Sequence, residues 1–249
     1  MFRQDVYERS RGGVLLLLNL ILLWTIISNN ALAAIDARTY IPNKAFSTIP
    51  LVKSEQERIF PDIPLPHYLG ALIEQESCIY LTHRLCWDPS SKLETSREIG
   101  IGLFQITKAY NKTGGIRFDT LRDLKRKYAK ELYELYWETI AQRSDLQIRS
   151  GLLLIRDNYK SLYEVKGPIN RLKMADSAYN GGLGNINKAR RACALASHCD
   201  PGIWTDNVEK YLPQSRSALY GSRSAYQINV EHVNTIFTIR LNKYRSLLV

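Results

Sequence analysis

Three short segments carry side chains that could do chemistry together: Glu74-Gln75-Glu76-Ser77, residues 100–107 (GIGLFQIT) and residues 177–182 (SAYNGG). Glu76 ends an apolar stripe at helical spacing, which is made by Leu65, Leu69, Leu72 and Ile73. A carboxyl group withdrawn from water keeps its proton near neutral pH, because burial penalises the charged form. Such a group can protonate a poor leaving oxygen, as cleavage of a glycosidic bond requires.

Each of these residues also has a reading that needs no substrate. Glu76 could be a surface residue after a core helix, and Ser77 a helix-end residue. Gln105 could be an ordinary loop residue, and Tyr179 a core tyrosine at a helix end. Asn180 and the glycine after it form a common turn pair. The combination of segments, rather than any one of them, favours a chemical role.

In this order and spacing, the three segments resemble the catalytic domain of the soluble lytic transglycosylases, which is similar in fold to goose-type lysozyme. That family has Glu-Ser at a helix end, then typically Gly-Leu-Met-Gln-Ile, then Ala-Tyr-Asn followed by a glycine. The resemblance covers residues 64–212. It implies a mainly α, lysozyme-like helical domain, with an irregular lead-in before it.

The resemblance implies a role for each matching residue. Glu76 is the expected single catalytic acid/base. The expected substrate-binding residues are Ser77, Gln105, Tyr179, Asn180 and Tyr211. Phe104 stands where the family usually has methionine, and we expect it to keep an apolar cleft wall. The resemblance implies no metal and no organic cofactor.

The implied reaction adds no water. Glu76 protonates the glycosidic oxygen between MurNAc and GlcNAc, and the substrate's N-acetyl group assists departure. Glu76 then takes the proton of the muramic acid 6-hydroxyl, which closes onto the anomeric carbon as a 1,6-anhydro-MurNAc end. Two alternatives stay open: a hydrolytic lysozyme (muramidase) using Glu98 as second carboxylate, or a non-catalytic wall-binding protein of a secretion or conjugation apparatus.

The charge balance agrees with an anionic partner. The chain has 34 Lys and Arg against 24 Asp and Glu, a net charge of +10, and basic proteins attract anionic polymers. No nucleic-acid-binding motif is present, so nucleic acid is not an expected partner. We expect peptidoglycan glycan strands as the substrate, and an envelope-spanning secretion or conjugation apparatus is a further candidate partner.

The N-terminal residues 1–33 have the layout of a secretory signal peptide. Basic residues precede an almost wholly apolar run over residues 14–27, and Ala31-Leu32-Ala33 forms an A-x-A site. The run is shorter than the roughly 17–25 residues of a membrane span. We therefore expect cleavage after Ala33 and a periplasmic protein. The alternative is an uncleaved inner-membrane anchor facing the periplasm, the one case that makes the membrane a partner.

Four cysteines fall into two close pairs, and an even number in an exported chain indicates disulfides. Three pairings are possible, and we favour the two local ones, Cys78–Cys86 and Cys193–Cys199. A zinc site is the rival interpretation because His83 and His198 lie near the cysteines. Neither cluster has the usual C-x2-C spacing, which disfavours zinc.

The elements that must position these residues are predicted to be helical. We expect an extended lead-in over residues 34–63, broken by prolines, a catalytic domain over 64–221 and a C-terminal helix over 222–249 packed on it. Apolar spacing predicts helices over 66–76, 120–141, 144–165, 168–179 and 184–196. Residues 78–115 are rich in turn formers and predicted to be irregular.

Overall fold

The computed structural model describes residues 35–248 of the 249-residue chain. The expected signal peptide and its cleavage site after Ala33 lie outside the described residues. The described part is mainly α, which confirms the expected fold class. Within residues 35–248, no helix has the length and apolar character needed to cross a membrane.

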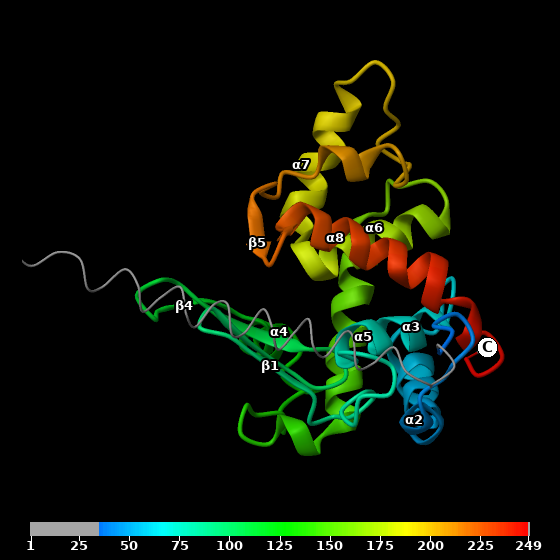
Figure 1. The fold of residues 1–249 in the computed structure, drawn as a ribbon, viewed down its shortest axis with the longest axis vertical. Coiled ribbons are helices and arrows are strands. Elements are labelled where there is room, and N and C mark those ends of the chain that lie inside the picture. The colour runs from blue at the N-terminus through cyan, green and yellow to red at the C-terminus, as the bar shows by residue number, and fades with distance from the viewer. Residues whose placement is uncertain (1–34, 249) are drawn as a thin grey trace, which may run out of the picture. The chain divides into compact units, whose positions relative to one another are not determined.

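The helices are α2 (Asn43–Ile59), α3 (Tyr68–Ser77), α4 (Thr120–Lys127), α5 (Ser144–Ser161), α6 (Pro168–Gly181), α7 (Leu183–Ala194) and α8 (Ala225–Thr235). Single-turn 3-10 segments are η1 (Ile140–Gln142), η2 (Val208–Tyr211) and η4 (Asn242–Tyr244), and η3 (Ile236–Arg240) is π-helical. Helix α5 packs against α2 and against α6. Figure 1 shows α2 and α3 beside one part of α5, with α6, α7 and α8 grouped at the other end.

Residues 92–119 form a four-stranded antiparallel sheet in the order β1-β2-β3-β4, with β1 (Lys92–Glu94), β2 (Glu98–Ile101), β3 (Ile106–Tyr110) and β4 (Ile116–Asp119). The expectation of an irregular segment over 78–115 was therefore wrong for β1, β2 and β3, whereas residues 78–91 are irregular as expected. These strands have three to five residues each, too few for alternation to stand out in the sequence. A second, two-stranded sheet pairs β5 (Ala218–Tyr220) with β6 (Arg223–Ser224).

The lead-in contains a 17-residue helix, α2, so the expectation of an extended segment over 34–63 was wrong there. Pro50 lies inside the helix, where it removes one backbone hydrogen bond. Tertiary packing outweighs this loss, because the apolar face of α2 joins the main core. Glu55 also accepts from the Arg149 guanidinium of α5 at 2.7 and 2.9 Å. The start of the described chain is thus part of the core.

Two other predicted helices are shorter than expected. The helix predicted over 120–141 ends at Lys127, and Leu132 and Leu135 reach the core from turns instead. Tyr136, which also lies in the predicted helix, is 52% exposed. The helix predicted over 222–249 begins at Ala225 and passes into η3 and η4. Apolar spacing therefore marked buried leucines such as Leu132 and Leu135 without predicting the backbone conformation that buries them.

The buried side chains form two clusters. The larger contains residues of α2, α3 and α5, the loop around Trp87 and the final residues to Leu248. The smaller contains residues of α6, α7 and α8 together with Trp204 and Leu212. Tyr159 and Phe237 pack against both clusters.

Candidate active site

An open cavity of about 900 Å³ is lined by residues from α3, the four-stranded sheet, α5, α6 and α8. Five of the six residues expected to act on or bind the substrate line it, namely Glu76, Ser77, Gln105, Tyr179 and Asn180. Tyr211 does not line this cavity: it belongs to η2 and is 36% exposed. The fold thus brings the three sequence segments to one cavity, and Tyr211 lies outside it.

Glu76 is positioned by the apolar face of α3. Leu69, Leu72 and Ile73 are fully buried and fix the helix so that its last turn reaches the cavity. The Glu76 side chain is 14% exposed. The pKa of Glu76 is raised from 4.5 to about 7, because burial and the nearby Asp176 carboxylate together raise it more than His232 and Arg240 lower it. Near neutral pH, Glu76 can therefore give and take a proton.

A histidine and an aspartate that the sequence analysis did not single out lie behind Glu76. His232 Nδ1, on α8, is 3.6 Å from Glu76 Oε1, and its Nε2 is 3.4 Å from Asp176 Oδ1 on α6. Asp176 is fully buried, and its Oδ1 also accepts from the Tyr68 hydroxyl at 2.6 Å. Burial lowers the pKa of His232, but the Asp176 and Glu76 carboxylates outweigh burial and leave it raised. No local sequence motif indicates that these two residues act together, because they belong to separate helices.

Tyr179 joins α6 to the segment that contains Gln105. Its hydroxyl donates to the backbone carbonyl of Phe104. Among the described residues, no hydrogen bond joins this hydroxyl to the Glu76 carboxyl. Burial and the Glu76 and Asp176 carboxylates raise the pKa of Tyr179 well above its usual value, so the phenol stays neutral and remains a donor.

The Gln105 side chain has a buried acceptor without a protein partner. Its Nε2 donates to the carbonyls of Gly102 at 2.9 Å and Ser91 at 3.3 Å. Its Oε1 is buried and has no protein partner, an arrangement that costs free energy unless a donor arrives. Because Gln105 lines the cavity, a ligand hydroxyl or amide could supply that donor.

A second glutamine, missed in the sequence, holds this segment in place. Gln147 of α5 is fully buried and accepts from the Leu103 backbone N–H at 2.9 Å. Its Nε2 donates to the carbonyls of Pro89 at 2.9 Å and Ile140 at 2.5 Å. Gly102 has a φ of +89°, and a Cβ there would lie 2.1 Å from Gln147 Oε1. Only glycine permits this close approach.

Phe104 is not a cleft wall, contrary to expectation. The side chain is fully buried and does not line the cavity. It packs on Gly151 of α5, where an added Cβ would lie 2.1 Å from the ring. The side chain at this position therefore anchors the segment to the core, which explains why an aromatic ring fits there.

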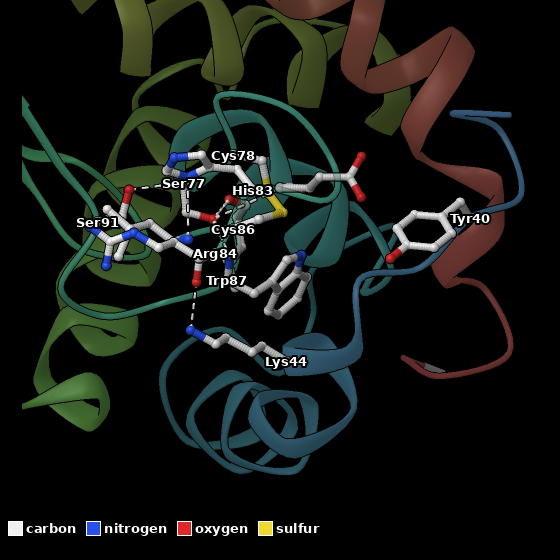
Figure 2. The surroundings of a disulfide bond; sticks show 12 residues. Tyr40, Lys44, Ser77, Cys78, His83, Arg84, Cys86, Trp87 and Ser91 are labelled. Atoms are coloured by element: carbon white, nitrogen blue, oxygen red, sulfur yellow. Dashed lines mark hydrogen bonds between the residues drawn. A yellow bond between two sulfur atoms is a disulfide. The ribbon is translucent and has the colours of Figure 1, made fainter. Parts of the chain in front are cut away.

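Ser77 is occupied by the protein itself. Its hydroxyl donates to the Ile73 carbonyl at 2.6 Å and accepts from the Trp87 backbone N–H at 3.1 Å. Its own carbonyl accepts from the Ser91 hydroxyl at 3.0 Å. Figure 2 shows Ser77 beside the disulfide between Cys78 and Cys86, with Trp87 and Ser91 around it. These contacts tie the end of α3 to the loop that follows.

Both expected cysteine pairs form disulfides, Cys78–Cys86 and Cys193–Cys199. The zinc interpretation is therefore left without thiolate ligands. Among residues 35–248, no group of three or more His, Cys, Asp or Glu residues is arranged to hold a metal ion.

Side-chain amides at the α8 side of the cavity were also missed in the sequence. Asn229 is 1% exposed and its Oδ1 accepts from the Ser177 hydroxyl at 3.0 Å, but its Nδ2 has no protein partner. Both amide atoms of Gln214 are buried without partners. Asn180 follows Ser177 closely in the sequence, and its exposed side chain belongs to a residue that lines the cavity. This part of the cavity is thus polar and able to bind amide or hydroxyl groups.

Comparison with known proteins gives a partial likeness. No protein-family model matches the chain. Over 114 residues the chain is 32% identical to membrane-bound lytic murein transglycosylase F of Shewanella denitrificans. The match covers 44% of this chain and 22% of that relative, so the chain corresponds to a minor part of the relative's length.

Proposed function

We propose that the chain is a peptidoglycan lytic transglycosylase that uses Glu76 as its single acid/base. The observation that carries the proposal is the buried Glu76 carboxyl, whose pKa of about 7 lies where one group can act as both acid and base. The similarity to a lytic murein transglycosylase supports the same class of reaction. The size and openness of the cavity suit a polymeric sugar chain.

In the proposed reaction, Glu76 first donates its proton to the glycosidic oxygen between MurNAc and GlcNAc. The C–O bond breaks as the substrate's N-acetyl group stabilises the anomeric carbon. Glu76, now a carboxylate, removes the proton of the muramic acid 6-hydroxyl, and that oxygen bonds to the anomeric carbon. Glu76 ends protonated, as it began, and the product carries a 1,6-anhydro-MurNAc end.

The residues proposed to bind substrate act in different ways, some by direct contact and others by holding the site in place. Gln105 offers its free Oε1 as acceptor for a sugar hydroxyl or amide, and Asn180 offers an exposed amide beside the reacting sugar. Tyr179 acts through Phe104, whose carbonyl it holds. The Ser77 hydroxyl already has backbone partners, so its contribution to binding is mainly to fix the end of α3.

A hydrolytic lysozyme is the second candidate. Glu98 lines the same cavity as Glu76. A second carboxylate could activate water, as in inverting glycosidases, or form a covalent glycosyl-enzyme that water then hydrolyses, as in retaining ones. The similarity to a transglycosylase favours the non-hydrolytic route. A wall-binding protein without turnover is less well supported, because it gives no reason to bury a carboxyl with a raised pKa.

The location, partners and domain limits complete the proposal. The substrate is the peptidoglycan glycan strand, so the protein acts in the periplasm, and a secretion or conjugation apparatus is a candidate partner. We keep residues 64–221 as the body of the catalytic domain. Residues 222–249 contribute to it directly, since Ala225, Asn229 and His232 line the cavity.

The proposal is tested by measuring how fast wild type, Glu76→Gln and Glu98→Gln clear a suspension of purified peptidoglycan. We expect wild type and Glu98→Gln to clear at similar rates and Glu76→Gln to lose about 10²–10⁴-fold. Loss of clearing in Glu98→Gln would favour the lysozyme. Equal clearing by wild type and Glu76→Gln would contradict the assignment of Glu76.

A further inference from the structure

The Asp176 carboxyl group lies against one ring nitrogen of His232, and Glu76 lies against the other. Asp176 Oδ1 faces His232 Nε2 at 3.4 Å and already accepts from the Tyr68 hydroxyl. The contact lies at ion-pair distance but is not aligned as a hydrogen bond. A carboxylate oxygen so close can only accept, which favours the tautomer with its hydrogen on Nε2. In the neutral imidazole, Nδ1 then holds a lone pair, and it points toward Glu76 Oε1 at 3.6 Å.

The contact between Nδ1 and Oε1 suits one proton. With no proton between Nδ1 and Oε1, two lone pairs would face each other. With two protons, two hydrogen-bond donors would face each other. With one proton, either a protonated Glu76 donates to a neutral His232, or a cationic His232 faces a Glu76 carboxylate. The distance of 3.6 Å is just beyond hydrogen-bond range, as is common for catalytic contacts before substrate binds.

We propose that Glu76 and His232 share this proton as a coupled pair, with His232 as the positioning residue that aims the Glu76 carboxyl and Asp176 as the group that fixes the imidazole. The inference rests on the proposed function, in which Glu76 is the acid/base. His232 gains and loses no proton over a full turnover, because Glu76 recovers its proton from the 6-hydroxyl. The sequence pattern contains neither His232 nor Asp176 among its motif residues.

The surroundings make the coupling strong. The His232 side chain is 5% exposed and Asp176 is fully buried, so water screens these charges weakly. The other groups that act on the pair are Tyr179 of α6, Tyr68 of α3 and Arg240 of η3. A cationic His232 lowers the pKa of Glu76, and an ionised Glu76 raises the pKa of His232.

The coupling is tested by nuclear magnetic resonance titration of the full exported chain, observing the Glu76 side-chain carboxyl carbon and the His232 ring nitrogens. In His232→Gln, the Glu76 midpoint should rise by about 1 pH unit, since a close opposite charge shifts a pKa by 1–3 units. In Glu76→Gln, the His232 midpoint should fall by a similar amount. Unchanged midpoints in both variants would overturn the pair.

A matched control is His67→Gln. His67 is a buried histidine at the start of α3, and it does not line the cavity. This variant should leave the Glu76 midpoint unchanged. If circular dichroism shows that a variant does not fold, the wild-type titration curves alone test the coupling. In a coupled pair, the signals of both residues show two inflections at the same pH values. A single inflection for each residue, at unrelated pH values, would contradict coupling.

The titration separates this inference from the proposed function. Midpoint shifts of the expected sign in a protein that leaves peptidoglycan intact would support the pair and overturn only the function. If the protein does cleave peptidoglycan, the alkaline limb of its kcat/KM profile should move upward in His232→Gln by the same amount as the Glu76 midpoint. A uniform loss of kcat/KM at every pH, with no movement of the limb, would indicate a merely structural histidine.

Discussion

Two glutamates two residues apart on α3 have opposite surroundings. Glu74 is fully buried and meets Arg240 at 3.0 Å, Lys243 at 2.7 Å and the Tyr244 hydroxyl at 2.6 Å. These three donors compensate a buried charge, so Glu74 is structural. Glu76 has no Lys or Arg within salt-bridge range among the described residues, and it faces His232 instead. The chemical difference between the two carboxyls therefore comes from their partners.

The raised pKa of Glu76 has a consequence for stability. Between pH 4.5 and about 7, the Glu76 carboxyl is still protonated in the folded state but has already lost its proton in the unfolded chain. The free energy of unfolding therefore falls as pH rises through this window. We predict that Glu76→Gln is more stable than wild type at pH 8, by about 2 kcal/mol, in urea unfolding followed by fluorescence.

Glu74→Gln is the matched comparison. It leaves Arg240 and Lys243 without their buried counter-charge, so we predict a loss of about 3 kcal/mol at the same pH. If both variants were destabilised alike, Glu76 would be another structural carboxylate and its proposed role would lose its physical basis.

At the scale of elements, the turn before Gln105 depends on a glycine and a helix. Gly102 adopts a positive φ directly against Gln147 of α5. We predict that Gly102→Ala destabilises the protein by about 3 kcal/mol or more, because it adds a clash in a well-packed site to backbone strain. The measurement is a urea unfolding midpoint together with the clearing rate, which should fall as Gln105 shifts.

Gly114→Ala serves as control for backbone strain alone. Gly114 has a φ of +81°, but an added Cβ would meet nothing within 4 Å. Its cost should be about 1 kcal/mol, with clearing unchanged. Equal costs at the two glycines would mean that the contact with Gln147 does not hold the segment.

The sequence predicted the elements with long apolar periodicity and missed those that depend on distant contacts. Helices α3 and α6 were expected close to their observed bounds. Helix α2 was not, since its proline opposes a helix and its packing on α5 cannot be seen in the sequence. The sheet was not predicted either, because its strands are short and pair only through backbone groups that no side-chain pattern reveals.

The same limit applies to the site. Glu76, Gln105, Tyr179 and Asn180 belong to short segments with a recognisable order, and all four line the cavity. His232 and Gln147 act through contacts with residues far away in the chain. Only the folded chain brings them together, so one sequence gives no signal for either.

At the scale of the whole molecule, the two disulfides belong to different cores. Cys86 is part of the larger cluster and its partner Cys78 lines the cavity, whereas Cys193 belongs to the smaller cluster. We predict that replacing either pair by serines costs about 2–3 kcal/mol. Only loss of Cys78–Cys86 should also reduce clearing of peptidoglycan, because that bond holds the end of α3.

The comparison requires both double variants at a temperature where each is fully folded by circular dichroism. Equal effects on clearing would show that the first disulfide does not position Glu76 and acts only on stability.

The central claim is tested most directly by mass spectrometry of the soluble products that the protein releases from purified peptidoglycan, with Glu76→Gln beside wild type. We predict 1,6-anhydro-muropeptides from wild type and none from Glu76→Gln. Products with reducing ends would contradict the transglycosylase and favour hydrolysis with Glu98. Anhydro products from both proteins in equal amount would contradict the role of Glu76.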